Sequence, residues 1–250
     1  MNQEGETEVE NDPILGVVPS LDAAAVAPHH HLMARPSEPF EITPDILMRA
    51  YSIGLFPMAE SAGSSTLFWV DPKERGIFPL DGLKISRSLA KTVRAERFEI
   101  RADNDFDTVI ACCAERDKTW INADIRRLYA ALFAEGRAHS IEVLEEGALV
   151  GGLYGVSLGA AFFGESMFHI ARDASKVALV HLAARLRYGG FRLLDTQFVT
   201  PHLASLGAIE ISRDVYLGLL DEALDEPANF NAWPATQVMS GRDALALVQP

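Results

Sequence analysis

The sequence predicts an α+β fold, in which helices flank a mixed β-sheet. Three segments rich in β-branched and aromatic residues, 139–144, 149–157 and 160–167, follow one another with glycine-containing turns between them. This is the pattern of an antiparallel meander. A helix is then predicted at about 175–188, and a last strand at 191–197 is apolar at its start and polar at its end. Polar groups at the end of a buried strand are where such folds place their chemistry.

The predicted central helix carries a single apolar stripe. Its side chains recur at the i, i+3, i+4 and i+7 spacing of one buried face: Leu179, Leu182, Ala183 and Leu186. Two glycines at 189–190 end the helix. The helix should therefore pack along the sheet with this stripe facing the core.

Before the meander, the chain falls into a leader and a first ordered segment. Residues 1–38 are acidic and rich in Ala, Pro and His, which predicts a disordered leader. Thr43 as N-cap, Pro44 in the first turn and Gly54 as a stop predict a helix between them. The aromatic- and Pro-rich stretch 54–80 is predicted to be loop that packs against the core. Alternatively, it forms the wall of a pocket.

One basic stripe stands out in residues 84–101. Its members recur at spacings of three and four and would share a helical face: Lys84, Arg87, Lys91 and Arg94. This face is either solvated or binds phosphates. Further helices are predicted after Asn104, after Asn122 and after Ser212, each of which can serve as an N-cap. Trp120, in a polar loop, is either a lid over the core or a stacking platform.

Charge, cysteines and hydropathy limit the possible functions. The net charge is −13, of which residues 1–40 contribute −6 and residues 221–250 contribute −4, leaving −3 for residues 41–220. A nearly neutral body can carry a local basic face, so nucleic-acid binding is not excluded. The neighbouring Cys112 and Cys113 offer neither a disulfide framework nor a metal-ligand spacing. From this spacing we expect no bound metal. No apolar run reaches the ~18 residues of a membrane span, and no secretory leader is visible, so we expect a cytoplasmic protein.

The candidates for chemistry lie at the end of the last strand and on the third strand of the meander. Positions 195 and 197 point to the same face of a regular strand, and Glu165 could lie near them. A carboxylate and an amide that face one cleft can hold an amine and manage its proton. Alternatively, Asp195 and Gln197 merely cap the turn at Thr200 and Pro201. The sequence HIARDASKVA before the central helix has no glycine loop for a diphosphate.

Several motifs in register resemble one bacterial enzyme family. They are AYSIGLFP, FWVDPKER, KISRSL, TWI, HSIEV, VGGLYGV, GESMF, ASK, and D-x-Q followed by H-x-ASLGA, and they span roughly residues 40–235. In this order they are similar to the leucyl/phenylalanyl-tRNA–protein transferases. The meander, helix and strand also resemble the acetyltransferase fold, whose usual acyl donor is coenzyme A.

The resemblance implies an activity, a domain organisation and partners. The family transfers Leu or Phe, and less readily Met, from aminoacyl-tRNA to the N-terminal Arg or Lys of an acceptor protein, which marks it for degradation. It implies a small N-terminal domain at 39–80, an acetyltransferase-like (GNAT-type) catalytic domain at 81–235 and a C-terminal tail at 236–250. The donor is an ester, so no cofactor is implied, in agreement with the missing diphosphate loop. The partners are the 3′ ends of Leu-tRNA and Phe-tRNA and the acceptor protein, with no membrane, and the protein is expected to be a monomer.

The resemblance also assigns residues. Asp195 and Gln197 match the family's catalytic pair, and Glu165 its cleft glutamate. The pocket for the donor side chain maps onto five apolar positions: Leu153, Phe162, Leu179, Leu186 and Leu194. The family pattern has Phe and Ile where this sequence has Leu186 and Leu194, which leaves the Leu:Phe preference open.

The resemblance places the donor's adenosine and acceptor stem as well. Trp120 matches a tryptophan near the terminal adenosine, where stacking is worth ~1–3 kcal/mol per base. Met58 stands where the family often carries a second tryptophan. The basic stripe, Lys84, Arg87, Lys91 and Arg94, aligns with the region that would hold the acceptor stem.

Chemistry sets the expected roles of the catalytic residues. An amide has no useful basicity, so Gln197 would position the acceptor's amine through its carbonyl oxygen. Asp195 would polarise that arrangement and receive the proton, directly or through water, while Glu165 would pair with the acceptor's cation or orient the ribose. Two other classes of protein stay open at this point: a coenzyme A-dependent acetyltransferase, and an adaptor that binds tRNA or N-degrons without catalysis.

Overall fold

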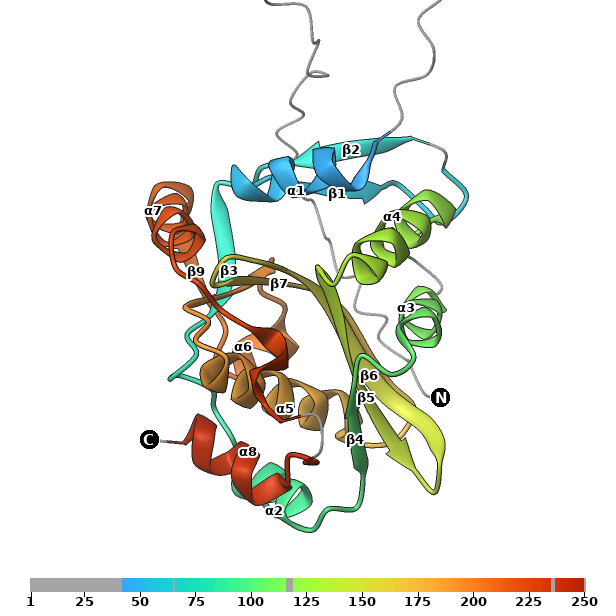
Figure 1. The fold of residues 1–250 in the computed structure, drawn as a ribbon, viewed down its shortest axis with the longest axis vertical. Helices are drawn as coiled ribbons and strands as arrows, with labels where there is room; N and C mark the ends of the chain where they lie inside the picture. The colour runs from blue at the N-terminus through green and yellow to red at the C-terminus, as the bar shows by residue number, and fades with distance from the viewer. Residues whose placement is uncertain (1–41, 65, 116–118, 235–236, 250) are drawn as a thin grey trace, which may run out of the picture.

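The computed structural model describes residues 42–64, 66–115, 119–234 and 237–249 (Figure 1). The predicted leader at 1–38 lies outside them. In this described part, a two-stranded sheet joins β1 (Phe56–Ala59) and β2 (Leu67–Val70), and a seven-stranded sheet has the order β4-β5-β6-β7-β8-β3-β9. The strands of the larger sheet are β3 (Glu74–Phe78), β4 (Glu99–Ala102), β5 (Ala138–Glu145), β6 (Ala148–Leu158), β7 (Ala161–His169), β8 (Leu193–Gln197) and β9 (Ile209–Ser212). The structure confirms the mixed α+β class.

Helices of the described chain pack around these sheets. They are α1 (Pro44–Ser52), α2 (Arg87–Arg94), α3 (Phe106–Ala114), α4 (Ala123–Ala134), α5 (Ala174–Tyr188), α6 (Pro201–Ser205), α7 (Arg213–Leu224) and α8 (Gly241–Val248), with a 3₁₀ turn at Phe230–Ala232. None of the described helices is long and apolar enough to cross a membrane.

The predicted meander, helix and strand are confirmed. β5 pairs antiparallel with β6, and β6 with β7. After α5, β8 returns beside β7 in the parallel direction, so the sheet is mixed. The β7–β8 ladder covers only Ala161–Phe163 of β7 against Leu193–Asp195 of β8. Beyond this ladder the two strands diverge.

The stretch at 54–80 contains the strands β1, β2 and β3, so the prediction of a loop is wrong. β1 and β2 pair with each other, while β3 enters the large sheet and pairs antiparallel with both β8 and β9. Gly76 makes this possible, because a Cβ there would lie 2.8 Å from the Phe198 carbonyl carbon and 2.8 Å from Thr196 Oγ1. Residues of β3, which come before the meander in the chain, therefore border the end of β8.

Two hydrophobic clusters fill the two faces of the large sheet. One holds apolar side chains of α1, α3, α4 and α7, and the other those of α2, α5 and α8. In Figure 1, α3 and α4 lie on one side of β5 and β6, with α5 on the other. The sheet is thus covered on both faces, which explains why β5 is buried almost throughout and β6 is buried in its middle, from Gly151 to Val156.

The predicted helix starts are mostly confirmed. Thr43, Asn122 and Ser212 each accept a hydrogen bond from a backbone N–H of the first turn. Asn104 was predicted to cap α3, but Asp105 does so, because its Oδ1 accepts from the Thr108 N–H at 3.3 Å. The C-terminal residues, for which the sequence indicated no element, form α8, whose apolar side chains join the α2 and α5 cluster.

Candidate active site

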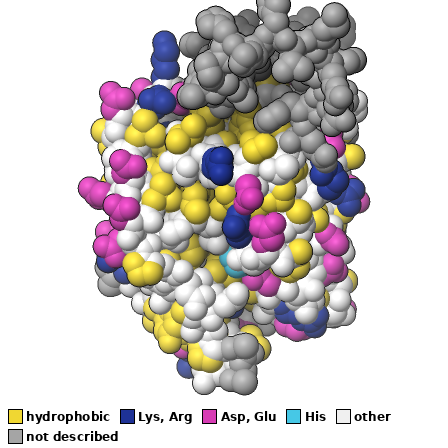
Figure 2. All heavy atoms as spheres, turned by 45° about the horizontal axis from the view of Figure 1, so that its top comes forward, with side chains coloured by type: hydrophobic (Ala, Val, Ile, Leu, Met, Phe, Trp, Pro, Cys, Tyr) yellow, Lys and Arg dark blue, Asp and Glu magenta, His cyan; other side chains and the backbone are white. Residues whose placement is uncertain are grey.

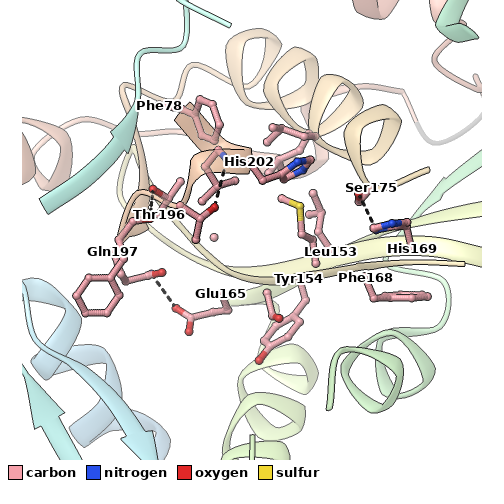
Figure 3. A pocket seen from close by; sticks show the side chains of 18 of the residues that line it. Phe78, Leu153, Tyr154, Glu165, Phe168, His169, Ser175, Thr196, Gln197 and His202 are labelled. Carbon is pink, nitrogen blue, oxygen red and sulfur yellow. Dashed lines mark hydrogen bonds between the residues drawn. The ribbon is translucent and has the colours of Figure 1, made fainter. Parts of the chain in front are cut away.

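A cavity of about 630 Å³ opens where β7 and β8 diverge (Figure 3). The second half of β7, Gly164 to His169, forms one wall, and the end of β8 with the following residues forms another. Side chains from β1, β3, α5 and α6 complete the lining. The size is that of a small-molecule site.

The part of the cavity beneath α5 is apolar. Its side chains come from four strands and two helices: Phe78, Leu153, Met167, Leu179, Leu182, Leu194 and Leu203. Three of the five predicted pocket residues, Leu153, Leu179 and Leu194, are among them. The cavity therefore has an apolar slot beneath α5.

Phe162 and Leu186 are both fully buried in the same hydrophobic cluster but do not line the cavity. Phe162 instead stacks on Phe230, with ring centroids 5.8 Å apart. Leu186 lies seven residues beyond Leu179, which at 1.5 Å per residue is ~10 Å further along α5. The helical period predicts which side chains share a face but not where a cavity along that face ends.

Glu165 is the polar centre of the cavity. Tyr51 donates to its Oε1 at 2.7 Å, Tyr129 donates to its Oε2 at 3.0 Å, and the two phenolic oxygens are 2.5 Å apart. Two phenolic protons can fill only two of these three contacts, so a proton on Glu165 would fill the third. Burial raises the pKa of Glu165 to about 7, although the tyrosine hydrogen bonds oppose the rise. A carboxyl with this pKa can take up and release a proton near neutral pH.

Gln197 lies beside Glu165 and has an unusual backbone. Its φ is +56°, in the left-handed region that side chains other than glycine rarely adopt. As drawn in Figure 3, Nε2 is 3.3 Å from Glu165 Oε1. With the amide turned over, the nitrogen donates to the Gly164 carbonyl at 2.9 Å and the Thr196 carbonyl at 3.1 Å. This second orientation makes two hydrogen bonds and turns the amide oxygen toward Glu165.

Asp195 does not share the cavity with Gln197, so the expectation that both face one cleft is wrong. The Asp195 side chain is 0% exposed. Its carboxylate accepts from Arg75, from the Tyr216 hydroxyl at 2.9 Å and from the Gln197 backbone N–H at 2.7 Å. The left-handed residue at 197 breaks the two-residue alternation on which the expectation depended.

Arg75 is the buried cation that sequence reasoning missed. Its Nη2 is 2.5 Å from Asp195 Oδ2, its Nη1 donates to the Gly54 carbonyl at 2.7 Å, and its guanidinium lies between the rings of Phe56 and Tyr216. Burial lowers the pKa of Arg75, but the charge and hydrogen bonds of Asp195 outweigh it, so the net shift is upward. In the sequence, Arg75 stands among other charged residues, and nothing there distinguishes it from a solvated side chain.

Tyr51 and Tyr129 were also missed as site residues. Tyr51 lies in the first predicted helix, and in the structure it packs in the core cluster that contains α1, α3, α4 and α7. Both rings are fully buried, and only their hydroxyl groups reach Glu165. The position of a tyrosine on an apolar helical face does not indicate which residue its hydroxyl group contacts.

Trp120 and Met58, the two predicted adenosine contacts, both line the cavity. They are partly buried, and Phe56 and Cys112 line the same region. The cavity therefore has aromatic and thioether surface in addition to the slot beneath α5. Such surface can pack on a nucleobase.

The predicted basic stripe lies outside the cavity. All four of its side chains are exposed, and none lines the cavity. Arg87, Lys91 and Arg94 are on α2, whereas Lys84 precedes the helix and its backbone N–H donates to the Leu206 carbonyl at 2.8 Å. The shared helical face thus holds for three of the four. Among the described residues no group of three or more His, Cys, Asp or Glu could hold a metal ion.

Comparisons with known proteins give the family. The model of the leucyl/phenylalanyl-tRNA protein transferase N-terminal domain matches residues 40–73, and that of the leucyl/phenylalanyl-tRNA protein transferase matches residues 77–221. A relative of that name from Afipia carboxidovorans is 58% identical over 222 residues, which cover 87% of this chain and 98% of the relative. One from Rhodopseudomonas palustris (strain HaA2) is 56% identical over 221 residues, 87% of this chain and 99% of the relative.

A comparison with solved structures gives weaker evidence than the sequence matches do. The C-terminal domain of a putative lysylphosphatidylglycerol synthetase from Agrobacterium fabrum aligns with a TM-score of 0.36 and 10% identity, over 74% of this chain and 58% of that one. At that score the likeness does not identify a fold family. The sequence matches do identify the protein family: this chain belongs to the leucyl/phenylalanyl-tRNA protein transferases.

Proposed function

We propose that this chain transfers Leu or Phe, and less readily Met, from aminoacyl-tRNA to the N-terminal Arg or Lys of acceptor proteins. The new peptide bond marks the acceptor for N-degron degradation. The observation that carries the proposal is the apolar slot beside Glu165 and Gln197 in a member of this family. Because an ester is already an activated acyl donor, the reaction needs no cofactor. We expect a cytoplasmic monomer.

The slot beneath α5 selects the donor side chain. Leu153 and Leu194 line it from the sheet and Leu179 from the helix, so it is apolar on opposing sides. A slot of this kind accepts unbranched, γ-branched and aromatic side chains. It rejects a β-branched isomer sterically, although one misplaced methyl group gives only ~1–3 kcal/mol of selectivity.

Gln197 and Glu165 manage the incoming amine. With its nitrogen held by the Gly164 and Thr196 carbonyls, Gln197 offers its oxygen to an N–H of the acceptor's α-amine. The amine nitrogen attacks the ester carbonyl carbon, the new C–N bond forms, and the C–O bond to the ribose breaks. Glu165 accepts a proton from the nitrogen and returns one to the departing ribose oxygen, so the step is balanced. Holding the two reactants together supplies much of the rate.

Asp195 and Arg75 are positioning residues in this scheme. Asp195 is enclosed and already accepts three kinds of donor, so we assign the proton to Glu165 instead. The Asp195 carboxylate accepts from the Gln197 backbone N–H and so favours the left-handed conformation that aims the Gln197 amide. Arg75 neutralises Asp195 and ties it to the Gly54 carbonyl.

The tRNA end would occupy the remaining surface. We propose that the terminal adenine packs between Trp120 and Met58, and that the acceptor stem contacts the basic stripe formed by Lys84, Arg87, Lys91 and Arg94. Domain limits of 39–80, 81–235 and 236–250 and an acetyltransferase-like catalytic domain remain part of the proposal. The antiparallel β6–β7 pair, the helix α5 and the parallel but diverging β8 support that fold.

The experiment that tests the function is single-turnover transfer of labelled Leu from Leu-tRNA to a peptide that begins with Arg. Matched peptides beginning with Ala or with acetyl-Arg are the controls. Transfer only to the free Arg or Lys terminus supports the proposal. Binding of charged tRNA without transfer would favour an adaptor, and acetyl transfer from acetyl-coenzyme A would favour an acetyltransferase.

A further inference from the structure

The mouth of the cavity carries a cluster of basic side chains from three elements. His169 ends β7, Lys176 is in the first turn of α5, and His202 is in α6. His169 and His202 line the cavity and are exposed, and Lys176 is partly exposed. Burial, and then the charges of Lys176 and His169, lower the pKa of His202. The three side chains therefore lie close enough to interact electrostatically. We name this cluster the mouth cluster.

Asp173 is an acid that contacts the mouth cluster. Asp173 accepts from Lys176 Nζ at 2.9 Å and lies 3.7 Å from Nε of Arg172, whose side chain is 90% exposed. An ammonium has three protons, and this contact uses one of them. On the other side of the cavity, Glu115 is the exposed acid of the lining. An anion at the mouth is therefore favoured on the α5 side.

The start of α5 adds to this field. Asp173 is the N-cap residue but makes no side-chain cap hydrogen bond, and its φ is +67°. Ser175, in the first turn, lines the cavity, and its Oγ is 3.5 Å from His169 Nδ1 (Figure 3). The positive end of this 15-residue helix thus faces the mouth together with the basic side chains.

The visible part of one face of the molecule carries no broad basic patch. The chain has a net charge of −13. On the part of the face in Figure 2 that grey atoms leave visible, Lys and Arg side chains are scattered among Asp and Glu rather than gathered into one broad patch. The basic stripe of α2 does not line the cavity. Among the described side chains that line the cavity, His169 and His202 are the basic ones, so a phosphate close to the reacting ester would meet them and the neighbouring Lys176.

We propose that His169, Lys176 and His202 bind the phosphodiester that precedes the terminal adenosine of the donor. The inference rests on the proposed function. If the adenine packs on Trp120 and the ester lies at Glu165 and Gln197, the 5′ oxygen of the same ribose leads out through the exposed part of the lining. That part includes His169 and His202, and Lys176 stands beside them.

The test compares donors that share one ester but differ in phosphates. Phenylalanine is esterified to adenosine, to cytidylyl-adenosine and to full-length tRNA, and transfer to an Arg peptide is measured with wild type, Lys176→Ala and Lys176→Arg. Lys73→Ala, which removes an exposed Lys that does not line the cavity, is the matched control. Lys91→Ala, on α2, separates acceptor-stem contacts from mouth contacts.

We expect Lys176→Ala to raise KM roughly five- to tenfold for both phosphodiester donors, with kcat little changed, because an exposed charge contact is worth about 1 kcal/mol. The adenosine ester should show no such rise, Lys176→Arg should restore most of the KM, and Lys73→Ala should change nothing. Lys91→Ala should affect only full-length tRNA. The dependence of KM on salt should also become shallower in Lys176→Ala, because one phosphate contact is lost.

Three results would overturn the inference. An equal loss with the adenosine ester would give Lys176 a role unrelated to phosphate, and no loss with any donor would remove it from binding. A loss that depends instead on acidic residues in the acceptor peptide would assign the mouth cluster to the acceptor. If wild type transfers from no donor, the proposed function fails. Binding of unacylated cytidylyl-adenosine against adenosine, in wild type and Lys176→Ala, then still decides the inference.

Discussion

Arg75 and Asp195 form a buried ion pair, in which Arg75 Nη2 is 2.5 Å from Asp195 Oδ2 and Arg75 Nε is 3.0 Å from Asp195 Oδ1. Asp195 stands two residues before Gln197 on β8. The residues are 120 positions apart in the chain and meet because β3 pairs with β8. Neither side chain lines the cavity. The pair therefore acts on the site through the backbone of β8, which ends in Gln197.

The ion pair predicts strong coupling between its members. Arg75→Met should lower the free energy of unfolding by ~3–5 kcal/mol, because it leaves the Asp195 carboxylate buried without its partner. Arg75→Met with Asp195→Asn should regain most of that loss. Urea unfolding of the two single variants and the double variant measures the coupling. Arg97→Met, which breaks an exposed pair with Glu145, is the control and should change little. Additive effects of Arg75 and Asp195 would contradict the structure.

The raised pKa of Glu165 predicts the pH dependence of transfer. Glu165 titrates at about 7, so its ionised, proton-accepting form grows as pH rises through 7. The rate of single-turnover transfer should rise over the same range in wild type. Glu165→Gln should be slow and should lack this rise, keeping only the rise that comes from deprotonation of the acceptor's own amine, near ~7.7–8.0. Asp195→Asn should be slower than wild type but keep the rise at 7. Loss of the rise in Asp195→Asn would assign the proton to Asp195.

The same pKa also predicts how stability changes with pH. The folded-state pKa lies above the unfolded value, so folded Glu165 holds its proton over a range in which the unfolded residue does not. Its contribution to stability is complete below the unfolded pKa of ~4.3 and is lost as pH rises through about 7. A change from 4.5 to about 7 corresponds to roughly 3 kcal/mol as an upper limit. Relative to Glu165→Gln, the wild type should therefore lose stability as pH rises from ~4.3 to about 7. If the free energies of unfolding of the two proteins change in parallel with pH, the pKa of Glu165 is not raised in the folded state.

Two leucines on α5 test the position of the slot. Leu179 lines the cavity and Leu186 does not, although both are buried in one cluster. Leu179→Ala should lower kcat/KM for Leu donors roughly 10- to 200-fold, because the donor side chain loses part of its wall. Leu186→Ala should cost ~2–5 kcal/mol of stability and leave the Leu:Phe ratio unchanged. A change in that ratio with Leu186→Ala alone would place the slot deeper along α5.

Trp120 and Met58 test the adenosine contact. Trp120→Ala should raise KM for every adenosine-containing donor by an amount equivalent to ~1–3 kcal/mol, because one stacking surface is lost. Met58→Trp should lower KM, since an indole offers more area to the base than a thioether does. Both variants are measured with the phenylalanyl-adenosine ester, so that contacts to the rest of the tRNA do not contribute. Equal KM values in wild type and Trp120→Ala would remove the base from this wall.

Much of the fold follows from local sequence patterns. The meander, α5 and three helix caps agree with the structure because hydrophobic period, turn residues and cap residues act over a few neighbouring positions. β3 was missed because its five residues gain their pairing from β8 and β9, more than 100 positions away. No local pattern records such a partner.

The candidate site also contains residues that the sequence marks and residues that only the tertiary structure brings together. Glu165, Gln197 and three slot leucines could be placed because motifs and strand ends mark them, and all of them line the cavity. Asp195 was placed in the wrong environment because the left-handed backbone at Gln197 depends on tertiary contacts. Arg75, Tyr51 and Tyr129 reach the site only through long-range packing. The mouth cluster was not foreseen, since its members come from three elements.

The most direct measurement is a structure of the protein with phenylalanine joined by an amide bond to 3′-amino-adenosine, which cannot react. The phenyl ring should lie between Leu153, Leu179 and Leu194, with its carbonyl group near Gln197 and the adenine against Trp120. The ribose 5′ oxygen should point toward Lys176. Density for the ring outside the slot beneath α5, or for the adenine on the α2 face, would contradict the assignment of this cavity as the place where ester and amine meet.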